Sequence, residues 1–144
     1  MAELTAQQVE QLLAEAQRAT DHSYAPFSRF QVGAAILTQG GEIFTGCNVE
    51  NSCYGLTNCA ERTAIFSAVA AGALGAGREL AAVAVVHRGG EVCSPCGACR
   101  QVIFEFGPEA IVIYRSHSGE IVQSKAKELL PEGFRLRQVD LHHE

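Results

Sequence analysis

The chain has 144 residues, of which 47% are hydrophobic and 19% charged, and its formal net charge is −5. This length is enough for one domain with a buried core, and the composition is that of an ordinary globular protein. Lysine and arginine are scattered, which weighs against a nucleic-acid polymer as a partner. The longest uncharged and mostly apolar stretch, residues 64–77, is too short to span a membrane, so we expect no membrane partner. The N-terminus is polar where a signal peptide would be basic and then apolar, so we expect a cytoplasmic protein.

The first half of the chain predicts a helix, a hairpin and a second helix. Apolar residues at helical spacing indicate a helix over 5–20, and Thr5 and Gln8 form a capping box at its start. After a loop with Pro26, two apolar runs on either side of a Gly-Gly turn predict a β-hairpin. The predicted elements of this half are a helix over 5–20, strands over 30–37 and 43–48, an irregular stretch over 49–58 and a helix over 60–71 that is ended by Gly72.

The second half alternates strands and helices. Its predicted elements are a buried strand over 81–86, a helix that begins at the second cysteine motif and ends near Phe106, a strand over 110–114, a short strand from Ile121 and a short helix over 125–130. Strand–helix–strand units favour parallel inner strands with right-handed crossovers, and the hairpin adds an antiparallel portion. We therefore predict an α/β fold: a single three-layer α-β-α domain over residues 1–144, with a mixed sheet of about five strands and a polar tail after about residue 136.

Two cysteine motifs carry the chemistry. The first is Cys59-Ala60-Glu61, and the second is Pro95-Cys96-Gly97-Ala98-Cys99. Three thiolates can hold a zinc ion and leave its fourth tetrahedral position open for water. Cys96 and Cys99 are three residues apart, so at the start of a helix their sulfurs lie on one face. Glu61 can reach the water without binding the metal and can carry protons as a general base and acid. These are the parts needed to replace an amine by a hydroxyl on an aromatic ring.

The surroundings of the three cysteines fit this interpretation. Two predicted helices would begin at the site, and their dipoles favour the excess negative charge of three thiolates over one zinc ion. Arg62 lies one turn after Cys59 and could donate to its sulfur, which would keep the zinc acidic. Since we expect a cytoplasmic protein, metal binding is favoured over disulfides.

Other interpretations of the cysteines explain less. Cys93, Cys96 and Cys99 form a C-x₂-C-x₂-C run of the iron–sulfur kind, but that interpretation leaves the first motif unexplained. We interpret Cys47, Cys53 and Cys93 as thiols that bind no metal, and the five histidines show no ligand spacing.

Cys-x-Glu followed by Pro-Cys-x-x-Cys is the all-cysteine form of the zinc deaminase signature. With the further segments below, the chain resembles the cytidine deaminase family, in its short homotetrameric branch with three cysteine ligands. The segments that carry the resemblance are 24–28, 30–35, 46–51, 57–64, 94–101 and 129–134. Gly55 stands where many members have proline, which could loosen the loop before Cys59 without touching the chemistry.

The resemblance implies further site residues. Asn48 and Glu50 would hold the ribose hydroxyls, and Phe27 would line the pyrimidine pocket. The backbone around Ala60 and Ser94 would bracket the base. The aromatic ring of Phe134 would enter the active site of a neighbouring subunit in a homotetramer.

The predicted function is the hydrolytic deamination of cytidine and deoxycytidine to uridine and deoxyuridine with release of ammonia, a step of pyrimidine salvage. One Zn²⁺ per subunit would be held by Cys59, Cys96 and Cys99, with Glu61 as the proton carrier. Three alternatives remain open. A deaminase of a modified aminopyrimidine nucleoside would use the same metal site. A nucleic-acid-editing deaminase would need a positive surface, which this acidic chain does not show. A metal-binding module without catalysis is the non-enzymatic alternative.

Overall fold

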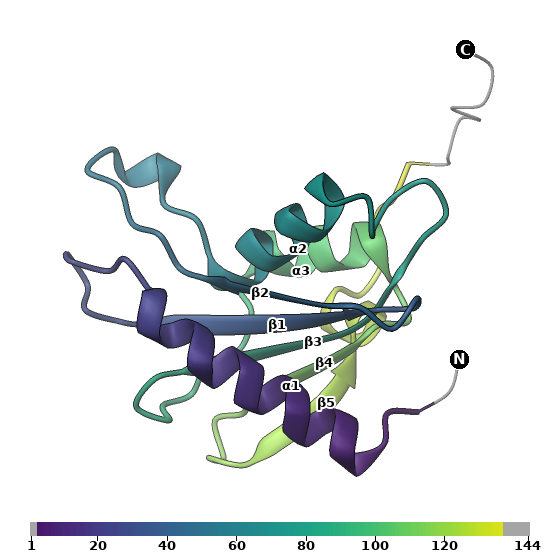
Figure 1. The fold of residues 1–144 in the computed structure, drawn as a ribbon, viewed down its shortest axis with the longest axis horizontal. Helices are drawn as coiled ribbons and strands as arrows, with labels where there is room; N and C mark the ends of the chain where they lie inside the picture. Colours follow the sequence, from purple (N-terminus) through teal and green to yellow (C-terminus); the bar gives the residue numbers. More distant parts are fainter. Residues whose placement is uncertain (1–2, 137–144) are drawn as a thin grey trace.

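The computed structural model describes residues 3–136, and within this range the chain forms one five-stranded sheet with helices on both faces (Figure 1). The strands are β1 (Val32–Thr38), β2 (Ile43–Cys47), β3 (Leu80–His87), β4 (Ile111–Arg115) and β5 (Ile121–Lys125). The helices are α1 (Ala6–Ala19), α2 (Ala60–Ala70), α3 (Gly97–Phe106) and α4 (Ala126–Leu129), with single 3₁₀ turns η1 (Thr20–His22) and η2 (Tyr54–Leu56). The predicted polar tail after about residue 136 lies outside the described residues.

The molecule has three layers, as the sequence predicts. Helix α1 lies on one face of the sheet, and α2 and α3 lie on the other (Figure 1). Alternate residues of β1 supply the two cores, because successive side chains of a strand point to opposite faces. Ala34 and Ile36 pack with α2, whereas Ala35 and Leu37 pack with α1. β1 is an interior strand of the sheet with helices over both of its faces, which explains why all seven of its residues are buried.

The strand pairing differs from the prediction in one respect. The sheet order is β2-β1-β3-β4-β5, and β1 pairs antiparallel with both β2 and β3. The only parallel pair in the described sheet is β3 with β4, joined through α3. The predicted parallel interior is therefore confined to these two strands. The reason is that β1, and not β2, pairs with β3. The connection from β2 through α2 to β3 therefore passes over β1, and the two strands that it joins are not neighbours.

The predicted elements occur in the predicted order, with small shifts at their ends. The capping box at the first helix is present, since the Thr5 hydroxyl accepts from the Gln8 amide and the Gln8 side chain accepts from the Thr5 amide. The first strand begins at Val32 rather than at residue 30, and the last helix is a single turn. Within residues 3–136, no helix has the length and apolar character needed to cross a membrane.

Candidate active site

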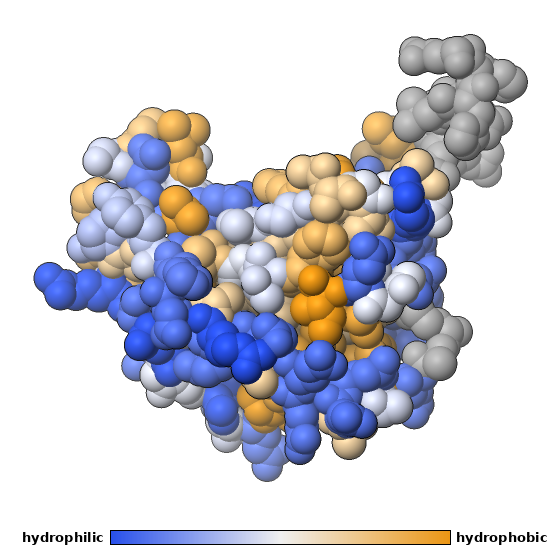
Figure 2. Space-filling view, in the orientation of Figure 1, coloured by the Kyte–Doolittle hydropathy of each residue, from blue (hydrophilic) through white to orange (hydrophobic). Residues whose placement is uncertain are grey.

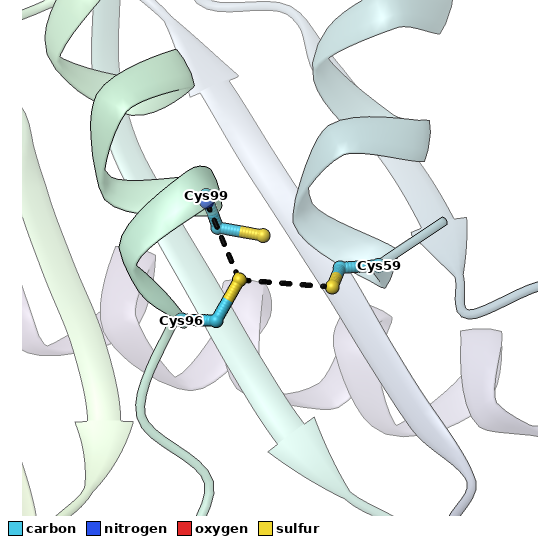
Figure 3. Close-up of side chains that lie close together, drawn as sticks. All are labelled: Cys59, Cys96 and Cys99. Atoms are coloured by element: carbon cyan, nitrogen blue, oxygen red, sulfur yellow. Dashed lines mark hydrogen bonds between the residues drawn. The ribbon is translucent and has the colours of Figure 1, made fainter. Parts of the chain in front are cut away.

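Three cysteine side chains meet where α2 and α3 begin. Figure 3 shows Cys59 at the start of α2, and Cys96 and Cys99 at the start of α3, with their sulfurs directed toward one another. The Sγ atoms of Cys59 and Cys96 are 3.9 Å apart, and all three sulfurs lie within 4.8 Å of one another. Among residues 3–136, this is the only group of three or more cysteine, histidine or acidic side chains close enough to share a metal ion. Cys93, the further thiol of the iron–sulfur alternative, is not part of it.

The thiol cluster fits a zinc ion. A tetrahedral centre with Zn–S bonds of about 2.3 Å requires neighbouring sulfurs to be about 3.8 Å apart. The 3.9 Å separation of Cys59 and Cys96 already meets this requirement, and the 4.8 Å limit on the others needs only a small closure. Soft thiolate donors in a tetrahedral arrangement are typical of zinc. Three protein ligands also leave one corner of the tetrahedron for water, as catalytic rather than structural zinc sites do.

Negative charge in the thiol cluster is stabilised from two directions. Cys59 and Cys96 are the N-cap residues of α2 and α3, so the positive ends of both helix dipoles face the sulfurs. The Cys96 sulfur also accepts a hydrogen bond from the Cys99 amide at 3.4 Å. On the other side, Nη2 of Arg62 donates to the Cys59 sulfur at 3.2 Å, as the sequence predicts. The Nε of Arg62 is buried and has no hydrogen-bond partner within the described residues.

These contacts favour a thiolate at Cys59. A hydrogen bond from the Cys99 thiol and the neighbouring Arg62 guanidinium lower the pKa of Cys59 to about 5, against the opposing effect of burial. The pKa of Cys99 is raised, because it keeps the proton that it donates to Cys59 and because it is buried. Burial raises the pKa of Cys93 to about 12, as expected for a core thiol that does not ionise.

Glu61 is a buried carboxylate beside the thiol cluster. Its side chain is only 3% exposed, which is rare for a glutamate without a cation directly paired to it. Burial raises the pKa of Glu61 to about 7, the negative charge of Cys59 adds to the increase, and a backbone hydrogen bond opposes it. A carboxylate in such a place is more typical of a functional group than of a surface charge.

Close packing between a strand and a helix fixes the start of α2. Gly46 of β2 faces α2 so closely that a Cβ at this position would lie 2.4 Å from the Ala64 nitrogen and 2.6 Å from the Ala60 oxygen. The backbone of β2 therefore contacts the first turns of α2 directly. This contact sets the distance of Cys59 and Glu61 from the sheet.

Two loops project from the sheet at the same end as the thiol cluster. Residues 23–31 and 48–58 run side by side, because Tyr24 pairs with Val49 and Val49 pairs with Asn58 in isolated β-bridges. Asn58 is the residue immediately before Cys59. In the space-filling view these loops form a lobe at the upper left, and a hollow separates the lobe from the surface over α2 (Figure 2). The bridge between Val49 and Asn58 thus brings the segment 48–50 beside the thiol cluster.

The side chains of Asn48 and Glu50 anchor the first of these loops. Asn48 Oδ1 accepts from the Val32 amide at 2.9 Å and from the Ser23 hydroxyl, and Asn48 Nδ2 donates to the Phe30 carbonyl at 2.7 Å. Glu50 Oε1 accepts from the Phe27 amide at 2.8 Å and from the next amide at 3.2 Å. The sequence did not reveal this structural role, because the partners of Asn48 and Glu50 lie 16 to 25 residues upstream.

The remaining predicted site residues fall into two groups. Ala60 is fully buried, backbone as well as side chain. Phe27 and Phe134 are 63% and 67% exposed, and neither ring packs in the core of its own chain. The backbone of Phe134 is held by Gln101 of α3, whose Nε2 donates to the Phe134 carbonyl at 2.9 Å. Sequence reasoning missed this contact, since a glutamine on an exposed helix face carries no signal of a partner 33 residues later.

The comparisons with known proteins agree with this geometry. The family described as "Cytidine and deoxycytidylate deaminase zinc-binding region" matches residues 6–115. A cytidine deaminase of Sporosarcina psychrophila is 47% identical over 127 residues, which is 88% of this chain and 90% of the relative. A cytidine deaminase of Mycobacterium tuberculosis is 42% identical over 87% of this chain and 88% of its own. The crystal structure of cytidine deaminase from Burkholderia pseudomallei superposes with a TM-score of 0.79 at 47% identity, covering 91% of this chain and 100% of that one. The chain therefore belongs to the cytidine and deoxycytidylate deaminase family.

Proposed function

We propose that the protein is a zinc-dependent hydrolase, one domain over residues 1–144, that converts cytidine and deoxycytidine to uridine and deoxyuridine with release of ammonia. The observation that carries this proposal is the meeting of three thiols, from the starts of two helices, beside a buried carboxylate two residues after the first thiol. The names of the relatives support the choice of substrate. A role in pyrimidine salvage follows from that reaction, and the cytoplasmic location expected from the sequence stays a prediction.

Cys59, Cys96 and Cys99 would hold one Zn²⁺ per subunit. When bound, zinc acts as a Lewis acid that lowers the pKa of a coordinated water and so supplies the nucleophile near neutral pH. Arg62 and the two helix N-termini draw electron density from the thiolates, so that three anionic ligands do not cancel the acidity of the metal.

Glu61 would carry the protons. It takes a proton from the attacking water and delivers it to N3 of the cytosine ring, which makes C4 electrophilic. After the oxygen has added to C4, Glu61 takes the remaining proton from the new C4 hydroxyl and delivers it to the amino group. The C4–N bond then breaks, ammonia leaves, and the C4 oxygen becomes the carbonyl of the product. Burial suits this role, because a desolvated carboxylate binds and releases protons near neutral pH instead of staying ionised.

Asn48, Glu50 and Phe27 would bind the nucleoside. The second N–H of the Asn48 amide is not used by the Phe30 carbonyl and can donate to a ribose hydroxyl, while the Glu50 carboxylate can accept from one. Both side chains are held by the 23–31 loop, so they are ordered before the ligand arrives. Phe27 extends from that loop with an exposed ring that can cover the pyrimidine. The backbone at Ala60 and Ser94 would complete the base pocket.

The substrate assignment is tested by ultraviolet absorbance with a panel of cytosine, cytidine, deoxycytidine, deoxycytidine monophosphate and a cytosine-containing oligonucleotide. We expect turnover of the two nucleosides and little or none of the others. Turnover of the oligonucleotide alone would instead indicate a nucleic-acid deaminase. Turnover of only a modified aminopyrimidine nucleoside would favour that closest alternative. Metal analysis separates the non-enzymatic alternative, because zinc at one ion per chain without any turnover would support a binding module.

We propose that the active species is a homotetramer in which Phe134 of one subunit covers the active site of another. Large apolar side chains exposed on one side of the chain support this assembly: Tyr54 and Leu56 on η2 are 89% and 67% exposed, and Phe66 and Val69 lie on the outer face of α2. Exposed apolar groups of this size are typical of protein–protein interfaces.

A mixing experiment tests the shared site. Glu61→Gln subunits lack the proton carrier and Phe134→Ala subunits lack the ring, so each variant alone should be impaired. Refolding them together should restore activity, because a site with Glu61 then receives Phe134 from its neighbour. No recovery in mixed assemblies, or full activity of a species that light scattering shows to be monomeric, would contradict the shared site while leaving the deaminase assignment intact.

A further inference from the structure

The segment after α4 presents an exposed aromatic ring on irregular backbone. Helix α4 ends at Leu129, and the following turn has a hydrogen bond from the Gly133 amide to the Leu130 carbonyl and a positive φ of 56° at Glu132. Phe134 follows directly and has no regular secondary structure. Such a ring has no fixed position unless other parts of the chain hold its backbone.

Two consecutive residues of α3 hold this backbone, in addition to the Arg135 side chain just beyond it, which bonds to Glu79 and to the Glu105 carbonyl. The Arg100 guanidinium donates through Nη1 to the Leu129 carbonyl at 3.2 Å, and the Gln101 amide donates through Nε2 to the Phe134 carbonyl at 2.9 Å. The two hydrogen bonds bracket the segment, one at each end. Between them, Gly133 approaches the Phe104 ring of α3 so closely that a Cβ would lie 2.8 Å from it.

Arg100 connects this segment to the thiol cluster as well. Its Nε donates to the Pro95 carbonyl at 2.8 Å, and its backbone amide donates to the Cys96 carbonyl at 2.9 Å. The guanidinium is planar and rigid, so the Leu129 and Pro95 carbonyls are held at a fixed distance from each other. Pro95 is the residue immediately before Cys96. One side chain thus fixes both the cysteine loop and the base of the segment that ends in Phe134.

We propose that Arg100 and Gln101 are positioning residues that fix the segment 129–134, and with it the Phe134 ring, relative to α3 of their own subunit. The inference rests on the proposed function, in which this ring covers a pyrimidine in the active site of a neighbouring subunit. Gln101 acts only on Phe134, whereas Arg100 acts on Phe134 and on the loop of Cys96. Loss of Gln101 therefore weakens substrate binding alone, and loss of Arg100 also weakens the retention of zinc.

The chain contains no tryptophan, so Phe134→Trp introduces a unique fluorescent reporter at the position in question. Acrylamide quenching of this indole is measured with Gln101 intact and with Gln101→Leu, which keeps much of the side-chain volume but has no donor. Gln7→Leu on α1, an exposed helical glutamine on the opposite face of the sheet, is the matched control. We expect stronger quenching with Gln101→Leu and no change with Gln7→Leu. Unchanged quenching in both would overturn the proposal, whether or not the protein deaminates cytidine.

Kinetics test the consequence for the substrate. In the otherwise native chain, Gln101→Leu should raise KM for cytidine about two- to tenfold with a smaller change in kcat, because the ring must be ordered when the substrate binds. In a Phe134→Ala background the same substitution should have no further effect, since residues that act through one group are not additive. Equal effects of Gln101→Leu in both backgrounds would mean that its role is structural and would overturn the positioning role.

Zinc retention tests Arg100 without any activity assay. Arg100→Met should release zinc to a chelator faster than the wild type, and Arg100→Lys, which keeps one donor, should lie between them. Gln101→Leu should release zinc at the wild-type rate. Equal zinc release by Arg100→Met and the wild type would refute the link to the cysteine loop. A wild-type protein that does not deaminate any nucleoside would refute the proposed function instead, while the quenching and zinc measurements would still decide the placement of the segment.

Discussion

Replacing Gly46 by alanine should disturb the active site from the far side of α2. The added Cβ would lie 2.4 Å from the Ala64 nitrogen and 2.6 Å from the Ala60 oxygen, both of them backbone atoms that cannot rotate away. Ordinary van der Waals contact begins near 3.4 Å. The start of α2 must therefore move away from β2 by roughly 1 Å, and Cys59 and Glu61 move with it. Overpacking of this kind costs about 1–3 kcal/mol of the free energy of unfolding.

Two measurements follow from this displacement. For a chain of this size, that free-energy loss corresponds to a decrease in Tm of about 2–12 °C, which differential scanning calorimetry can detect. A misplacement of about 1 Å at the reacting groups can lower kcat/KM by up to about 10²-fold. Gly55→Ala is the matched control, because nothing lies within 4 Å of a Cβ there and its φ is not positive. Wild-type Tm and kcat/KM in Gly46→Ala would show that β2 does not set the position of α2.

Four further substitutions test the roles assigned to these residues. Glu61→Gln should keep zinc and fold but lower kcat by about 10²–10⁴-fold, the usual contribution of a general acid–base group; near wild-type kcat would exclude Glu61 as the proton carrier. Cys59→Ala should abolish zinc binding in metal analysis, whereas Cys93→Ala should bind one zinc per chain, and the reverse result would mean that the ligands are misassigned. Glu50→Gln keeps an acceptor for the Phe27 amide but loses its charge, so KM for cytidine should rise about tenfold or more with zinc content unchanged; an unchanged KM would argue against ribose binding by Glu50.

The sequence was most informative where local patterns carry the signal. The Cys-x-Glu and Pro-Cys-x-x-Cys motifs predicted three thiols and a carboxylate in one place, and the structure confirms that the thiols of Cys59, Cys96 and Cys99 lie within 4.8 Å of one another. The contact of Arg62 with Cys59 was also predicted, because both residues share one turn of a helix and local geometry decides the distance. The capping box of Thr5 and Gln8 was confirmed for the same reason.

Long-range pairing was less accessible from the sequence. Alternating strands and helices predicted a mixed sheet of about five strands, but the pattern does not say which strand of the hairpin pairs with the next strand of the chain. In the structure β1 pairs antiparallel with β3, which leaves a single parallel pair within the described sheet. The seven buried residues of β1 show that both of its faces are covered, but they do not indicate which strands lie beside it. The order of the strands in the sheet is therefore decided by how the sheet packs against the two helix layers.

The sequence by itself therefore determined the fold class, the three thiols that cluster and the family resemblance, because each depends on residue types at short and fixed spacing. Only the tertiary structure showed that Asn48 and Glu50 anchor the 23–31 loop and that Gly46 sets the position of α2. It also showed that Arg100 and Gln101 bond to the two ends of the segment 129–134. These contacts join residues between 14 and 33 positions apart through backbone carbonyls, amides and close van der Waals approach. Backbone groups are the same in every residue, so no sequence pattern marks them, and the folded chain alone brings them together.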